Sequence, residues 1–158
     1  MTLIKECGFH DIKEHYETLK TDLIKMEYLE SVLKTAGISM DVKKFAFSTL
    51  AELYNKRLMF EKAARAMYGK AWFDITYREK IDSYLRAAEF FVKAGNIPSA
   101  DDMFLRAMRE ANTEQQQKIA LAKKNIYLAA AMEQEKKGRM ANSSKFYTHL
   151  LTLKLDDI

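Results

Sequence analysis

The amino-acid sequence predicts an all-α fold, a stack of antiparallel helical hairpins with about seven helices in a single domain over residues 1–158. Three observations predict it. Five glycines and one proline are too few for a fold that turns often. Ala, Leu, Lys, Glu, Met, Arg and Gln, all strong helix formers, dominate the chain. Small, aromatic and apolar residues recur with a spacing of 37, as in stacked helical repeats.

Composition indicates the class of protein and its compartment. Apolar residues make up 48% and charged residues 30%, as in a soluble globular domain. The single cysteine, Cys7, excludes an internal disulfide framework, and no signal peptide or long apolar run is visible. We therefore expect a cytoplasmic protein that does not span a membrane. The net charge is +4, but acidic and basic residues are interleaved, which disfavours nucleic-acid binding.

The first predicted element is a helix over residues 11–36, ended by Gly37. Asp11 is the expected N-cap, and Glu14 completes a capping box with it. An apolar stripe recurs every seven residues with two intervening positions, at Ile12, Tyr16, Leu19, Leu23, Met26 and Leu33. The stripe favours a helix that packs on the next hairpin, with a dimerisation helix as the alternative.

Helix starts recur with the spacing of 37, at Ser39, Thr76 and Thr113. Glu79 and Gln116 follow the two threonines by three residues, which predicts a capping box at each. Core positions share the spacing: Ala51 with Ala88, Tyr54 with Phe91, Phe60 with Ile97, Ala63 with Ala100 and Met67 with Phe104. A third unit follows at a step of 43, with Ala131, Gly138, Met140 and Tyr147.

These patterns predict three hairpins over residues 40–73, 77–111 and 114–152. The expected helices are 40–56 and 58–73, 77–94 and 97–111, and 114–137 and 139–152. Gly95 and Gly138 suit the left-handed residue that ends a helix, and Pro98 suits a first helical turn. The six extra residues of the third unit must lengthen its first helix.

The stretch from Ala88 to Ala100 resembles the tetratricopeptide repeat, with a small residue, an aromatic residue three later, a glycine, and an apolar–x–x–Ala step. The first unit has Leu58 in place of the glycine. The third has Gln134 in place of the aromatic residue and Ser143 in place of the alanine. The resemblance covers residues 40–152 and implies a right-handed stack of hairpins whose concave face binds a peptide or helix of a partner protein.

Carried over by position, the resemblance implies a groove lined by the first helix of each hairpin. Its predicted lining is Ser48, Glu52, Asn55, Lys56, Leu85, Glu89, Lys93, Asn125, Met132, Glu135 and Lys136. These residues do not reproduce the basic clamp with which chaperone-binding relatives hold an acidic C-terminus. The alternative is that several of them only pack against neighbouring helices.

Little in the sequence suggests chemistry, so we expect neither an enzyme nor a cofactor. Cys7 and His10, with His15 nearby, could form half of a zinc site, but no second Cys/His pair accompanies them and His149 stands alone. We interpret Trp72, Phe73 and Tyr77 as a plug between the first and second hairpins.

The leading hypothesis is an adaptor that binds another protein. The alternatives are an RNA- or DNA-binding helical repeat, and a protein that self-assembles through its N-terminal helix or its last hairpin.

Overall fold

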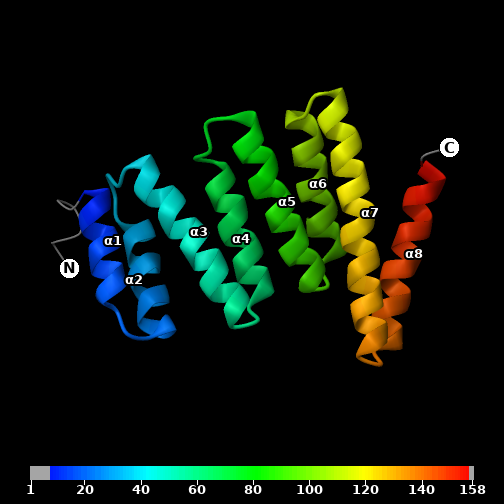
Figure 1. The fold of residues 1–158 in the computed structure, drawn as a ribbon, viewed down its shortest axis with the longest axis horizontal. Helices are drawn as coiled ribbons and strands as arrows, with labels where there is room; N and C mark the ends of the chain where they lie inside the picture. The colour runs from blue at the N-terminus through cyan, green and yellow to red at the C-terminus, as the bar shows by residue number, and fades with distance from the viewer. Residues whose placement is uncertain (1–7, 157–158) are drawn as a thin grey trace.

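The computed structural model describes residues 8–156, with side-chain surroundings for residues 8–153. Over that range the chain forms eight helices and no strand, which confirms an all-α fold and corrects the expected number of about seven. The helices stand in a row from α1 to α8, each antiparallel to the next (Figure 1). Their bounds are α1 Phe9–Thr18, α2 Asp22–Lys34, α3 Met40–Lys56, α4 Phe60–Ala71, α5 Tyr77–Lys93, α6 Ile97–Glu110, α7 Thr113–Lys136 and α8 Met140–Asp156.

The additional helix arises because the predicted helix over 11–36 is two helices, α1 and α2. The backbone turns out of α1 at Leu19, and the hydroxyl of Thr21 caps α2 by accepting a hydrogen bond from Ile24 N at 3.3 Å. The heptad stripe therefore does not lie on one continuous helix. Ile12 and Met26 are buried on separate helices, whereas Leu23 is exposed.

Three hairpins follow, and their turns have the same geometry. The N–H groups of Leu58, Gly95 and Gly138 each donate to the carbonyl three residues earlier, at 2.9–3.0 Å. The next N–H in each turn donates to the carbonyl five residues earlier, at 2.8–2.9 Å. All three residues have positive φ, at 60°, 79° and 73°. Leu58 thus adopts the conformation that glycine supplies in the other two turns.

Small side chains lie where the two helices of each hairpin pack. Ala51, Ala88 and Ala131 are fully buried at equivalent positions of α3, α5 and α7. In the third hairpin, Ser143 replaces the buried alanine of the other second helices, and its hydroxyl donates to the Ala131 carbonyl at 3.0 Å. A hydroxyl is tolerated there because it is satisfied across the hairpin.

Two predicted helix caps are displaced. Asn112, rather than Thr113, is the N-cap of α7, and it forms the capping box with Gln115. At α1, Asp11 is the third helical residue, where its carboxylate accepts from Gly8 N at 3.1 Å. At α7 two adjacent polar residues, Asn112 and Thr113, could each cap the helix, and at α1 the N-cap is Gly8, three residues before Asp11. The predicted caps at Ser39 and Thr76 are confirmed.

The predicted aromatic plug between the first two hairpins is wrong for two of its three residues. Trp72 is 70% exposed and Tyr77 is 68% exposed, whereas Phe73 is half-buried and stacks on Phe47. The reason is that α4 ends at Ala71 and the chain then turns Asp74 inward. The junction is filled by a charged group and its partners, which leaves the indole outside.

No helix within residues 8–156 combines the length and apolarity needed to cross a bilayer.

We predict that Leu58→Gly stabilises the protein. The leucine is exposed and holds a left-handed conformation that costs a non-glycine residue about 1–2 kcal/mol. Glycine removes that cost, but it also makes the unfolded chain more flexible, which lowers the free energy of unfolding by about 0.5–1 kcal/mol. We expect the free energy of unfolding, measured by urea denaturation, to rise by about 0.5–1 kcal/mol.

The matched control is Gly138→Ala in the equivalent turn. An added Cβ would meet nothing within 4 Å there, so only the positive φ opposes it. We expect the free energy of unfolding to fall by about 1 kcal/mol. A loss of stability in Leu58→Gly would show that the three turns are not energetically equivalent.

Candidate functional site

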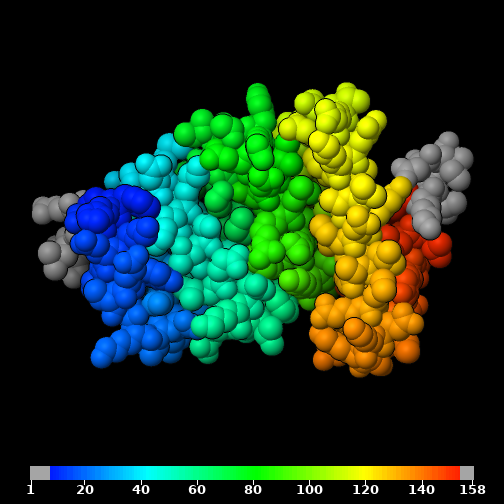
Figure 2. All heavy atoms as spheres, in the orientation of Figure 1, coloured from blue at the N-terminus to red at the C-terminus, as the bar shows by residue number. Residues whose placement is uncertain are grey.

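A cleft of about 670 Å³ lies between α5 and the α7–α8 hairpin. In Figure 2 the surface is indented between the green helices and the orange end of α7. One wall comes from the end of α5, with Glu89, Val92 and Lys93. The opposite wall comes from α7, α8 and the turn between them, and consists of Asn125, Ile126, Ala129, Ala130, Glu133, Gln134, Lys137, Arg139 and Phe146. Asn55, Leu58 and Phe60 of the first hairpin form its rim.

The cleft follows from a mismatch in helix length. α7 has 24 residues and α5 has 17, so α7 is seven residues, or about 10 Å, longer. The α7–α8 turn consequently lies beyond the α5–α6 turn, as Figure 1 shows at the lower ends of these helices. The last turns of α7 have no equal length of α5 to pack against. A hollow remains between them.

Four of the predicted groove residues line this cleft, and they come from three different hairpins: Asn55, Glu89, Lys93 and Asn125. Three others, Met132, Glu135 and Lys136, line a shallower hollow beside it on α7, and the two hollows share Ala129 and Glu133. Residues of α3, α5 and α7 therefore line the cleft, and the neighbouring hollow is lined by α7 alone.

The remaining four predicted residues have other surroundings. Lys56 pairs with Asp22 of α2 at 2.8 Å, and Glu52 pairs with Arg86 of α5 at 3.2 Å. Ser48 is half-buried within α3, and Leu85 packs against the hydrophobic core. Ser48 and Leu85 therefore fit the alternative interpretation, in which a predicted groove residue only packs against neighbouring helices.

Sequence reasoning found Asn125 but missed most of the α7–α8 side of the cleft. Ile126, Ala130 and Phe146 were not singled out, nor were Gln134 and Arg139 as lining residues. Two features could have indicated this side: the longer third unit, and Gln134 at a position that is aromatic in the other two hairpins. The amide oxygen of Gln134 is buried without a hydrogen-bond partner, and Met140 is 62% exposed where Ile97 is buried. The third hairpin packs less completely here.

The carboxylates of the cleft are paired with basic residues. Arg86 bonds to Glu89 at 3.0 Å and lies over the ring of Phe90. Lys137 bonds to Glu133 at 2.7 Å, and this hydrogen bond lowers the pKa of the Glu133 carboxyl. Both carboxylates of the walls therefore have a basic partner.

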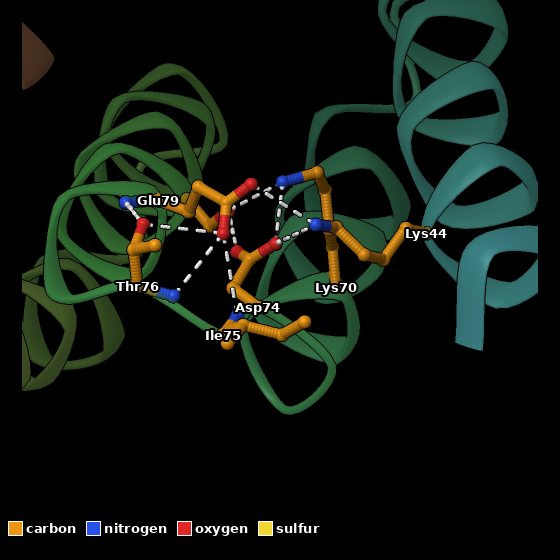
Figure 3. A network of polar contacts seen from close by, with 7 residues as sticks. Lys44, Lys70, Asp74, Ile75, Thr76 and Glu79 are labelled. Carbon is orange, nitrogen blue, oxygen red and sulfur yellow. Dashed lines mark hydrogen bonds and ion pairs between the residues drawn. The ribbon is translucent and has the colours of Figure 1, made fainter.

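A second polar cluster joins the first and second hairpins (Figure 3). Asp74, whose side chain is fully buried, bonds to Lys70 at 2.9 Å and accepts from the hydroxyl of Ser83 at 2.5 Å. Lys44 of α3 lies 3.6 Å from Asp74 and 3.1 Å from Glu79 of α5. The cluster therefore connects α3, α4 and α5 through charges that satisfy one another.

Serine, lysine and aspartate in mutual contact could suggest a nucleophile, because Lys70 Nζ lies 3.0 Å from Ser83 Oγ. Ser83 is only 2% exposed, however, so a substrate has no access to its hydroxyl. The geometry favours a structural role, a rigid joint between two hairpins.

A third polar cluster holds α8 to its neighbours. Asp101 of α6 accepts from the Tyr127 hydroxyl of α7 at 2.7 Å and pairs with His149 of α8 at 2.9 Å. Lys123 lies 3.3 Å from the same carboxylate. His149, which stands alone in the sequence, is thus placed by the fold in this polar cluster, on α8 away from the cleft lining.

The half zinc site considered from the sequence is not assembled among the described residues. Cys7 lies outside them. His10 pairs with Glu14 at 3.0 Å, whereas His15 stacks on the ring of Tyr28. Over residues 8–156 no group of three or more His, Cys, Asp or Glu side chains could hold a metal ion.

No family model, no curated protein and no solved structure matches this chain.

The joint between the hairpins predicts a dependence of stability on pH. The backbone N–H of Thr76, and then the ammonium of Lys44, lower the pKa of Glu79 to about 2, against 4.5 for an ordinary glutamate. Between these values the unfolded chain binds the proton and the folded chain does not, so this stabilisation is complete above about pH 4.5 and is lost as the pH falls toward 2. We expect the free energy of unfolding to rise as the pH increases from about 2 to 4.5.

The measurement is urea unfolding from pH 2.5 to 6 in the wild type, in Glu79→Gln and in Glu27→Gln, an exposed residue of α2. The glutamine at position 79 should flatten the rise, and the change at position 27 should leave it in place. Equal slopes in all three proteins would contradict the role assigned to Glu79.

Proposed function

We propose that this chain is a non-catalytic protein-interaction module, a divergent tetratricopeptide-type stack of hairpins that holds a peptide or helix of a partner protein in the cleft. The observation that carries the proposal is the convergence of predicted groove residues from three hairpins on one concave region. Its volume lies within the range of about 300–1,000 Å³ that is typical of ligand sites.

The chemistry of the walls also supports a peptide guest. Val92, Ile126 and Ala130 give the cleft an apolar lining, and the small side chains of Ala129 and Ala130 let a guest backbone approach α7. The side chains of Asn55 and Asn125 provide donors and acceptors for main-chain groups. Apolar walls with a few polar groups fit a peptide segment better than they fit a reaction centre.

The proposed module would act in the cytoplasm as an adaptor. The repeat pattern supports this assignment, since hairpin repeats of this kind commonly offer extended binding surfaces on their concave side.

The test is photo-crosslinking in the native cell. A photoreactive residue at position 125, in the cleft, should form crosslinks to another polypeptide. The same residue at Lys118, an exposed position of the same helix, should not. Ala129→Trp, which fills the cleft, should abolish the crosslinks from position 125, with Lys118→Trp as the matched control. Crosslinks that survive Ala129→Trp would contradict a role for the cleft.

Self-association is a second candidate, favoured by an apolar stripe on α7. Leu121, Leu128 and Met132 are 61%, 43% and 56% exposed and share one face of the helix. A second copy of the chain could cover it. If so, the mass measured by light scattering should be that of a dimer, and Leu128→Glu with Met132→Glu should return it to that of a monomer. A wild type that is monomeric at high concentration excludes this candidate.

A further inference from the structure

A smaller hollow of about 340 Å³ continues the cleft between the α5–α6 turn and the start of α8. The two hollows share Lys93, Gln134, Arg139 and Phe146, so a guest lying in the cleft can extend into the smaller one. The smaller hollow adds Asn142 and Lys145 of α8, together with Ala94 and Gly95 of the turn.

The smaller hollow is lined by three cations and no carboxylate: Lys93, Arg139 and Lys145. Lys145 makes only a long contact of 3.5 Å, to the carbonyl of Gly95. Among the described residues, the guanidinium of Arg139 has no ion-pair partner. This distinguishes the hollow from the cleft, where Glu89 and Glu133 are each bonded to a basic residue.

Two further features favour an anion at this place. The hollow adjoins the first turn of α8, whose leading N–H groups have no partner within the helix and carry partial positive charge. Like charges brought together in a concave site repel one another, and an anionic guest relieves that repulsion. The site therefore offers more attraction to a negative group than scattered surface lysines do.

The neighbouring cleft indicates which kind of anion fits. Its apolar wall, with Val92, Ile126 and Phe146, suits aliphatic side chains, whereas a chain of phosphates would place its charges against that wall. Gln134 lines both hollows with an unsatisfied amide oxygen, which a peptide N–H could satisfy after a rotation of the side chain. A peptide is favoured over a nucleic acid.

We infer that the smaller hollow binds a carboxylate of the partner, so that the guest is a peptide with an aspartate or glutamate next to its apolar anchor residues. The inference rests on the proposed function, because it names the chemistry of the segment held in the cleft. Arg139 and Lys145 are the main ligands of the carboxylate, and Lys93 contributes its charge from α5.

The experiment selects peptides from a random 12-residue library displayed on phage, using the full chain as bait. The wild type should enrich peptides that carry Asp or Glu beside apolar residues. A fluorescein-labelled copy of the most enriched peptide is then titrated in an anisotropy assay. Arg139→Glu with Lys145→Glu should weaken its binding by at least about tenfold, the expected effect of losing charged hydrogen bonds. Replacing the peptide's acid by its amide should weaken binding similarly.

The matched control carries Lys13→Glu and Lys118→Glu, which reverse the charge of two exposed residues away from both hollows. It changes the net charge by the same amount as the Arg139 and Lys145 variant. It should bind the peptide as the wild type does. Both double variants alter exposed side chains, and circular dichroism checks that each remains helical.

The outcomes separate the inference from the proposed function. Enriched peptides that lack acidic residues but lose binding in Ala129→Trp would overturn the inference and retain the peptide-binding cleft. Acidic peptides that bind the Arg139 and Lys145 variant normally would overturn it as well. Failure to enrich any peptide that depends on the cleft would contradict both. A 12-residue oligouridylate that competes as strongly as the peptide would assign the hollow to phosphates and overturn the inference.

Discussion

The structure depends on the close packing of two helices within each hairpin, which small buried side chains make possible. Ala51, Ala88 and Ala131 are inaccessible at equivalent positions, and Ser143 shows how strict the requirement is. Its hydroxyl is accommodated because it bonds to the Ala131 carbonyl, so the site keeps its small volume and leaves no unsatisfied donor. Three turns closed by the same hydrogen bonds then join the two helices of each of these hairpins.

Helix length then decides where the surfaces of neighbouring hairpins match. The first two hairpins have first helices of equal length, 17 residues, and their junction is filled by the cluster around Asp74. α7 is longer, and its last turns extend past α5. The cleft and the smaller basic hollow both lie in this mismatch. A few added residues in one helix thus generate a concave surface, while the turn that follows this helix keeps the hydrogen bonds of the other two turns.

The polar clusters divide into joints and exposed charges. Asp74 and Asp101 each hold three helices together through hydrogen bonds and lysine partners. Such groups are costly to leave unpaired, so they stabilise one arrangement of the hairpins. Arg139 and Lys145 differ, because their charges face a hollow that contains no carboxylate. The clusters around Asp74 and Asp101 therefore stabilise the fold, whereas Arg139 and Lys145 leave positive charge at the surface.

The sequence by itself determined what depends on neighbours along the chain. The caps at Ser39 and Thr76 and the left-handed turns at Gly95 and Gly138 follow from local backbone chemistry, and the buried alanines follow from helical periodicity. Sequence reasoning was wrong where more than one local structure is possible. Asn112 caps α7 in place of its neighbour Thr113, and Thr21 starts a new helix inside a continuous apolar pattern.

Only the tertiary structure decided which residues from different helices meet. The inward turn of Asp74 leaves Trp72 in solvent, and the overhang of α7 brings Lys93 of α5 beside Arg139 and Lys145 of the third hairpin. The physical reason is that caps and turns are short-range, whereas a cleft depends on the relative lengths and packing of helices that are far apart in sequence.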